Sequence, residues 1–170
     1  MRNVFTLTAC AVFLSSCAST APDGPSATAL IRPSSGSQVS GTVKFTQVGA
    51  RVRVDADITA LSPGLHGMHI HEKGDCTAAD GMSAGPHFSA TGKKHGGPDS
   101  SERHAGDLGN VTANASGKAT ISILVEGFSV GKGTDGIIGR AVIVHAGPDD
   151  LKTDPTGNSG GRIGCGVIAG

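Results

Sequence analysis

Residues 50–58 read "ARVRVDADI", and this stretch decides the fold class of the chain. Apolar and charged side chains alternate along it without interruption. The apolar set is Val52, Val54, Ala56 and Ile58, and the charged set is Arg51, Arg53, Asp55 and Asp57. Successive side chains of a β-strand point to opposite faces of a sheet. The alternation therefore predicts an antiparallel strand with one face on a core and the other in solvent.

Three similar runs lie to either side: "VSGTVKFTQ" at 39–47, "KATISILVEG" at 118–127 and "GRAVIVHAG" at 139–147. Turns rich in Gly, Asn or Asp separate them, and Gly occupies 27 of 170 positions, about twice its usual share of roughly 7%. No 3.6-residue apolar pattern persists after the N-terminal segment. We expect one all-β domain with the form of a sandwich or a barrel.

Two stretches interrupt this pattern, residues 72–107 and 146–161. Both are too long and irregular to be simple turns between strands. Long loops within a compact β domain usually carry function. We therefore expect the functional residues to gather there.

The N-terminal segment has the features of an export signal. Residues 1–16 combine a basic start, a short apolar run and small residues before Cys17. The ending "LSSC" resembles the lipobox of bacterial lipoproteins, which implies cleavage before Cys17 and acylation of its thiol; ordinary cleavage without lipid is the alternative. Residues 17–26 are small, polar and broken by proline, which is typical of a flexible tether. The folded domain is expected at 27–170, in the periplasm, with the outer membrane favoured for the anchor.

The remaining cysteines are informative in an exported protein. Cys10 leaves with the signal and Cys17 carries the lipid, so Cys76 and Cys165 remain in an oxidising compartment. We expect a disulfide between them, with two free thiols as the alternative. Closing a loop of about 90 residues would stabilise the fold by roughly 4–5 kcal/mol.

Composition argues against nucleic acid as a partner. Acidic and basic side chains balance at 14 each, and the chain has no Trp or Tyr. A basic surface with interleaved aromatic residues is therefore missing from the sequence.

Histidines concentrate in "HGMHIHEKGDC" at 66–76. Strand geometry places Met68 and Ile70 on one face and His69 and His71 on the other. His145 likewise lies opposite its apolar neighbours in "GRAVIVHAG". A lone pair of histidines two residues apart is weak evidence for a metal, but a third imidazole from another strand strengthens it.

The loop between these strands adds a second set of candidate ligands: His87, His95, His104 and Asp107. Neutral imidazoles with one carboxylate suit zinc, and a nitrogen-rich tetragonal set suits copper. The sequence supports two metals, although spacing alone does not assign the ligands between them.

Five segments together resemble the copper/zinc superoxide dismutase family: "HGMHIHEKGDC", "SAGPHF", "KHGGP", "ERHAGDLGNV" and "GNSGGRIGCGVI". They occur in the family's order, and the resemblance covers about 27–170. It implies an eight-stranded antiparallel Greek-key β-barrel of the immunoglobulin-like sandwich class, with two long functional loops. It also implies dismutation of superoxide to oxygen and hydrogen peroxide, which would protect the cell envelope.

The resemblance further implies a role for individual residues. Copper would be bound by His69, His71, His87 and His145, and zinc by His87, His95, His104 and Asp107. His87 would bridge the two metals as an imidazolate. His66 would support the copper ligands by hydrogen bonding, and Asp149 would link His69 to His95.

Arg162, three residues before Cys165, would face the copper channel and attract superoxide. The stretch "TAADGMSAGP" after Cys76 follows the manner of bacterial members, and residues 151–156 are shorter than in animal members. Lys152 is then the only basic candidate for steering in that segment.

Two readings compete with an enzyme. One is a non-catalytic copper or zinc buffer or delivery protein on the same barrel; the other is an adhesion-type sandwich tethered to the envelope. The copper set with Arg162 argues against the first, and the six candidate ligand histidines argue against the second. A homodimer and a monomer are both open from the sequence.

Overall fold

The computed structural model describes residues 23–170. The predicted signal at 1–16 and the predicted lipid on Cys17 lie outside the described residues, and they stay predictions. Within residues 23–170, no helix is long and apolar enough to cross a bilayer.

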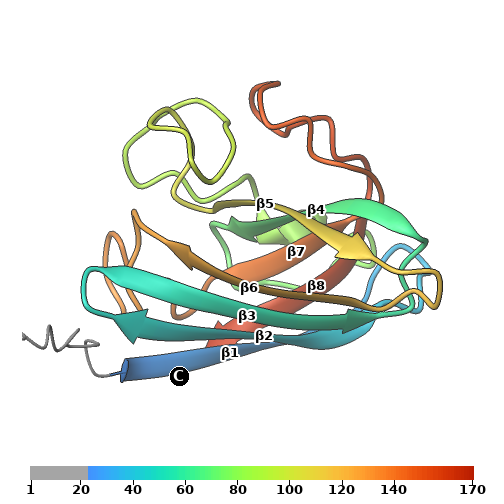
Figure 1. Ribbon diagram of the computed structural model, residues 1–170, viewed down its shortest axis with the longest axis horizontal. Coiled ribbons are helices and arrows are strands. Elements are labelled where there is room, and N and C mark those ends of the chain that lie inside the picture. The colour runs from blue at the N-terminus through green and yellow to red at the C-terminus, as the bar shows by residue number, and fades with distance from the viewer. Residues whose placement is uncertain (1–22) are drawn as a thin grey trace, which may run out of the picture.

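Eight strands form the domain (Figure 1), together with one short 3-10 turn, η1, at Met82–Ala84. The strands are β1 (Asp23–Pro33), β2 (Ser40–Val48), β3 (Arg51–Thr59), β4 (Gly64–His71), β5 (Asp107–Ala113), β6 (Ala119–Val125), β7 (Ala141–His145) and β8 (Arg162–Ala169).

The strands close into one antiparallel barrel in the order β1-β2-β3-β6-β5-β4-β7-β8. Sequence neighbours β3 and β4 are separated in the barrel by β6 and β5, and β6 and β7 by β5 and β4. These two crossing connections give the Greek-key arrangement, so the predicted fold class is confirmed. β5 meets β6 at a single residue pair, Ala113 with Ala119.

β3 shows why the opening stretch specifies this fold. Val52, Val54 and Ile58 are fully buried, whereas Arg51 and Asp57 are exposed. The strand pairs along its whole length with β2 and along seven residues with β6. Its apolar face therefore lines the barrel interior, as the alternation predicts.

β7 differs from β3 because both of its faces are buried. Val142 and Val144 pack in the barrel core, while Ala141 and Ile143 pack outside it with Ala84 of η1 and with Cys165. The loop that follows β4 therefore covers the outer side of β7. A strand covered on both faces provides a rigid support for the histidine at its end.

The first strand, β1, begins at Asp23, within residues 17–26, which were expected to form a flexible tether. Asp23 pairs with Val48 of β2, and its carboxylate accepts two hydrogen bonds from the guanidinium of Arg53, at 2.9 and 3.2 Å. Asp23 and Ser26, within the last four residues of the expected tether, are therefore paired with β2, with a register shift between them. Residues 23–26 are all exposed, so no pattern of apolar residues in the sequence indicates a strand there.

Two long loops, at 72–106 and 146–161, rise from the same side of the barrel (Figure 1). They were expected at 72–107 and 146–161; Asp107 is instead the first residue of β5. The backbone N–H of His95 in the first loop donates to the Asp154 carboxylate in the second at 2.7 Å. The two loops therefore support each other.

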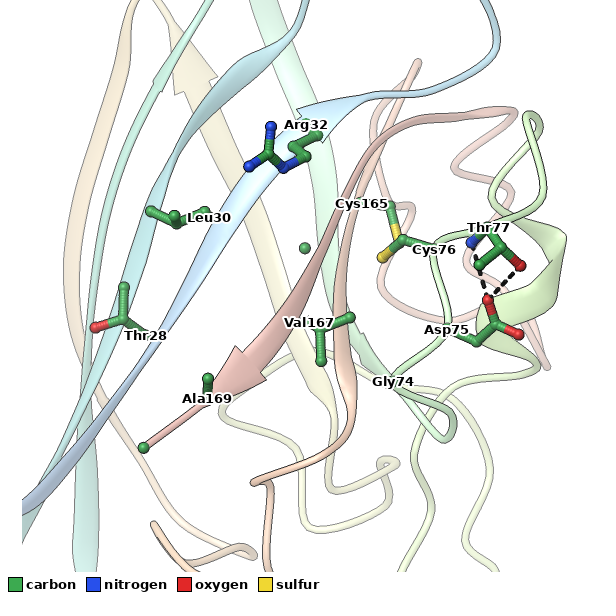
Figure 2. Close-up of a pocket in the computed structure, with 12 residues that line it drawn as sticks. Thr28, Leu30, Arg32, Gly74, Asp75, Cys76, Thr77, Cys165, Val167 and Ala169 are labelled. Atoms are coloured by element: carbon green, nitrogen blue, oxygen red, sulfur yellow. Dashed lines mark hydrogen bonds between the residues drawn. A yellow bond between two sulfur atoms is a disulfide. The ribbon is translucent and has the colours of Figure 1, made fainter.

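The predicted disulfide is confirmed. Cys76 and Cys165 are bonded, with 5.8 Å between their Cα atoms, and Figure 2 shows the bond joining the 72–106 loop to β8. The bond attaches the loop to the barrel wall close to η1.

Candidate metal centre

Three of the predicted ligands come from two neighbouring strands. β4 carries His69 and His71, and β7, its antiparallel neighbour, ends at His145. Met68 and Ile70 point into the barrel core and are fully buried. The imidazoles therefore leave the opposite face of the strand, under the loops.

The 72–106 loop returns His87 to the same place. His87 forms an isolated antiparallel bridge with His71, and the next residue, Phe88, donates its N–H to the carbonyl of Ile70 at 2.8 Å. Phe88 is buried in the core. This anchoring next to β4 sets the position of the His87 ring, whose centroid lies 4.0 Å from that of His69.

Each of these four rings uses one nitrogen in a hydrogen bond that fixes its orientation. The pairs are His69 Nε2 with Asp149 Oδ2 at 2.8 Å, His71 Nδ1 with the Gly85 carbonyl at 2.8 Å, His87 Nδ1 with Asp107 Oδ1 at 2.9 Å, and His145 Nδ1 with the Gly160 carbonyl at 3.1 Å.

The other nitrogen of each ring is buried and lacks a hydrogen-bond partner. Leaving four such atoms unpaired in a protein interior is unfavourable unless a ligand binds them. The four residues offer ligand atoms that all lie within 4.8 Å of one another. A set made only of imidazole nitrogens fits copper.

The protonation of these rings favours metal binding. Burial lowers the pKa of His145 to about 3 and that of His87 to about 4, although Asp107 opposes the shift at His87. Burial and the neighbouring His87 hold the pKa of His71 well below its usual value. These imidazoles are therefore neutral at pH 7, with lone pairs available to a cation.

A second group of ligands converges on Asp107. Its Oδ1 lies 2.9 Å from Nδ1 of His87, 3.1 Å from Nδ1 of His95 and 3.3 Å from Nδ1 of His104. Bonds of about 2.0–2.1 Å to a tetrahedral zinc would separate two ligand atoms by roughly 3.3 Å. Three ring nitrogens and one carboxylate oxygen with these spacings fit zinc.

The group of ligand atoms that lie within 4.8 Å of one another on this side is His69, His87, His95 and Asp107, without His104. His69 Nε2 is already bound to Asp149, and the other nitrogen of His69 is the unpartnered one in the first group. His104 therefore stays the predicted fourth ligand on this side. The Asp107 carboxylate is held by the backbone N–H groups of Gly96 and His104, at 3.0 and 2.8 Å.

Asp149 connects the two groups. Its Oδ2 accepts from His69 at 2.8 Å and its Oδ1 from His95 Nε2 at 2.8 Å. The Asn110 side chain binds both the N–H and the carbonyl of Asp149, at 2.8 and 2.9 Å. Burial alone would raise the pKa of Asp149, but these histidines hold it well below its usual range. Burial also opposes protonation of His95, yet Asp107 and Asp149 together raise the pKa of His95 to about 9.

Two supporting residues were not predicted from the sequence. Asn110 is one. The other is Gly157, whose φ of +63° is in the left-handed region and whose missing side chain leaves room for the Asp149–His95 hydrogen bond. A Cβ at this position would overlap Oδ1 of Asp149 and would lie 2.6 Å from His95 Nε2. The Thr-Gly-Asn sequence around it indicates a turn but not this contact.

His66 lies outside both ligand groups. Its Nδ1 is 2.8 Å from the carbonyl of His145, and its Nε2 is 2.9 Å from the carbonyl of Ser62. The ring thus ties the end of β7 to the connection before β4. It contacts the backbone of a copper-side ligand without facing the metal position.

A cavity of about 590 Å³ opens onto the copper-side group. His87 and His145 line it together with Arg162, whose Nη1 donates to the carbonyl of Gly81 at 2.9 Å. Burial lowers the pKa of Arg162. Asp80 lies on the same wall of the cavity, and its negative charge opposes that shift. Lys152 is exposed and does not line this cavity.

The family model described as copper/zinc superoxide dismutase matches residues 39–168. The matched range covers most of the chain, from just before β2 to the penultimate residue of β8. It includes both long loops and every residue of the two ligand groups.

Proposed function

Because the chain belongs to the copper/zinc superoxide dismutase family, we propose that it converts superoxide into dioxygen and hydrogen peroxide. One observation carries the proposal. The His87 ring presents Nδ1 to the Asp107 group and a buried, unpartnered Nε2 to the group of His69, His71 and His145. A single imidazole placed between two ligand sets is suited to bridge two metals.

In this proposal copper is held by His69, His71, His87 and His145, and zinc by His87, His95, His104 and Asp107. When bound there, copper would supply one-electron redox chemistry. In total, two superoxide anions and two protons yield one dioxygen and one hydrogen peroxide.

The protein's own groups guide the anion and supply a proton. The Arg162 guanidinium carries the positive charge on the cavity wall, and it attracts a small anion towards His87 and His145. His87 Nε2 can hold a proton while its Nδ1 stays within the Asp107 group, and it can release that proton to the reduced product. Asp149 keeps the rings of His69 and His95 oriented throughout.

We also propose the cellular setting that the sequence suggests. The mature protein would be exported to the periplasm and anchored by lipid at Cys17, where it would protect the envelope from superoxide. A homodimer stays an open alternative to a monomer.

The test uses the mature chain, residues 17–170 with Cys17 changed to Ala, after loading with copper and zinc. Superoxide from xanthine and xanthine oxidase reduces cytochrome c, and we expect catalytic inhibition of that reduction at substoichiometric protein. Urate formation is followed in parallel to show that the oxidase itself is not inhibited. The metal-free protein is the matched control. A fully loaded protein that fails to inhibit would favour the buffer or delivery reading.

A further inference from the structure

Three serines in the β1–β2 connection contact the backbone at the start of β8. The hydroxyls of Ser34 and Ser35 both donate to the carbonyl of Arg162, at 2.9 and 2.8 Å. The hydroxyl of Ser37 donates to the carbonyl of Ile163, and the backbone N–H of Ser34 donates to that same carbonyl at 3.1 Å. Two consecutive peptide units, one of them that of Arg162, are therefore held by this connection.

Ser35 adopts a conformation that a non-glycine residue rarely takes. Its φ is +51°, in the left-handed region, and Gly36 follows at +73°. Such a conformation is unfavourable for serine and persists only when its surroundings hold it. Here the N–H of Ser35 donates to the carbonyl of Ala79 at 2.6 Å while its hydroxyl reaches Arg162. The strained residue therefore joins the 72–106 loop to β8.

Arg162 is thus held at both ends. Its guanidinium donates to the Gly81 carbonyl, two residues beyond Ala79, and its own carbonyl accepts the two serine hydroxyls. A side chain at position 81 would lie 3.2 Å from the Arg162 Cβ, so the packing between the loop and the arginine is close. Ser35 also lines the cavity that Arg162 shares with His145.

The place of contact matters for the geometry of the site. Arg162 lies opposite His145 in the β7–β8 ladder, at a point where the register shifts. Regular ladder hydrogen bonds alone therefore define the arginine backbone less firmly here than along the rest of β8. The hydroxyl groups of Ser34 and Ser35 fix the position of the Arg162 backbone from outside the ladder.

We propose that Ser34 and Ser35 are positioning residues for Arg162, and that they set how strongly a small anion binds in the cavity above His87 and His145. The inference deepens the proposed function, in which that anion is superoxide. Each neutral hydrogen bond contributes roughly a factor of 2 to 12 to an equilibrium. Loss of both should therefore weaken anion binding measurably without removing a metal ligand.

The experiment compares three variants of the copper- and zinc-loaded protein. Ser34→Ala with Ser35→Gly removes both hydroxyls, and glycine accepts the positive φ without strain. Ser35→Gly alone removes one hydroxyl and is the variant of choice if the double variant folds poorly. Ser40→Ala is the matched control, because this exposed hydroxyl at the start of β2 lies 3.3 Å from the hydroxyl of Thr59 and does not bind the Arg162 carbonyl.

The probe is azide, whose binding to the copper(II) form is followed by absorbance, together with the dismutation rate as a function of ionic strength. For the double variant we expect azide affinity and the low-salt rate to fall roughly threefold to tenfold, with a shallower salt dependence. Metal content should be unchanged, and Ser40→Ala should match the unmodified protein in every measurement.

Unchanged azide affinity in the double variant would overturn the inference, even if its thermal stability falls, because a purely structural role predicts only that fall. An Arg162→Gln variant, which lacks the guanidinium, shows how much azide affinity is lost when the contribution of Arg162 is removed completely. If the unmodified protein binds azide but does not dismutate superoxide, the proposed function fails, while the azide comparison still decides the role of the two serines.

Discussion

Two groups of side chains lie on either side of the His87 ring, one facing Nδ1 and the other facing Nε2. Both contain buried imidazoles, yet the two groups differ in charge. On the Nδ1 side, Asp107 and Asp149 raise the pKa of His95 to about 9. On the Nε2 side the convergent group contains imidazoles only, and burial lowers the pKa of His145 to about 3. Before any metal binds, the Nδ1 side therefore holds two carboxylates around a protonated His95. The imidazoles on the Nε2 side are neutral and offer lone pairs. The placement of the carboxylates would thus favour different metals at two sites that are built mainly from one residue type.

The largest effect should come from removing the ring that joins the two sides. His87→Ala should lower both copper and zinc content and abolish dismutation, because one side chain serves both ligand sets. His71→Ala is the comparison, and it should lose copper while retaining zinc. Elemental analysis after dialysis against limiting metal measures both. Full zinc retention in His87→Ala would contradict a shared ligand.

The second largest effect should come from Asp149, whose carboxylate links His69 in one ligand group to His95 in the other. Asn at position 149 offers one acceptor oxygen where two ring N–H groups now donate, so one ring loses its orientation. Asp149→Asn should weaken zinc binding roughly 10- to 100-fold, measured by competition with a chromophoric chelator. Asp150→Asn is the control, because that neighbouring carboxylate binds only within its own loop. Equal losses in the two variants would assign the effect to the loop and not to the ring contacts.

The metal-free protein should show the charge difference as opposing pH dependences. The folded pKa values of His87 and His145, about 4 and 3, lie below the ordinary 6.5. Their contribution to stability is therefore complete above pH 6.5 and is lost as the pH falls below it. The folded pKa of His95 is raised to about 9, so its contribution is complete below pH 6.5 and is lost as the pH rises towards 9.

Thermal unfolding of the chelator-treated protein should therefore show a maximum near pH 6.5 between pH 4 and 9. His95→Asn should flatten the alkaline decline and leave the acid limb in place. A stability that rises steadily up to pH 9 would contradict the charge assignment on the Asp107 side.

The smallest effect should come from the wall of the cavity. Asp80 lies there with Arg162 and places a negative charge where an anion must pass. Asp80→Asn keeps an oxygen for the bond from the Met82 N–H and removes the charge. The low-salt dismutation rate should rise roughly twofold, and the gain should disappear at high ionic strength. Asp99→Asn, an exposed acid elsewhere, should leave the rate unchanged.

Periodicity in the sequence was sufficient for the barrel wall and for the direction of the β4 histidines. The alternation at 50–58 predicted β3. Met68 and Ile70 alternate with His69 and His71, and this predicted that the two imidazoles point away from the core. The division of ligands between two metals came from the family resemblance, because spacing along a chain does not say which nitrogen of a ring faces which neighbour.

Contacts made by backbone atoms could not be predicted. The carbonyls of Gly85 and Gly160 orient His71 and His145, and a carbonyl acceptor has no signature in residue type. The early start of β1 was missed for a related reason. Asp23 and Ser26 pair with β2, and the Asp23 carboxylate binds Arg53, while residues 23–26 are all exposed to solvent.

The disulfide between Cys76 and Cys165 has a consequence for proteolysis. It encloses His87, the Asp107 group, His145, Asp149 and Arg162 within one covalent ring of the chain. A protease that cuts once between Cys76 and Cys165, in either loop, therefore yields a nicked molecule. Its two fragments stay covalently linked until a reductant cleaves the disulfide. In a compartment rich in proteases and poor in thiols, a single cleavage need not release any part of the centre.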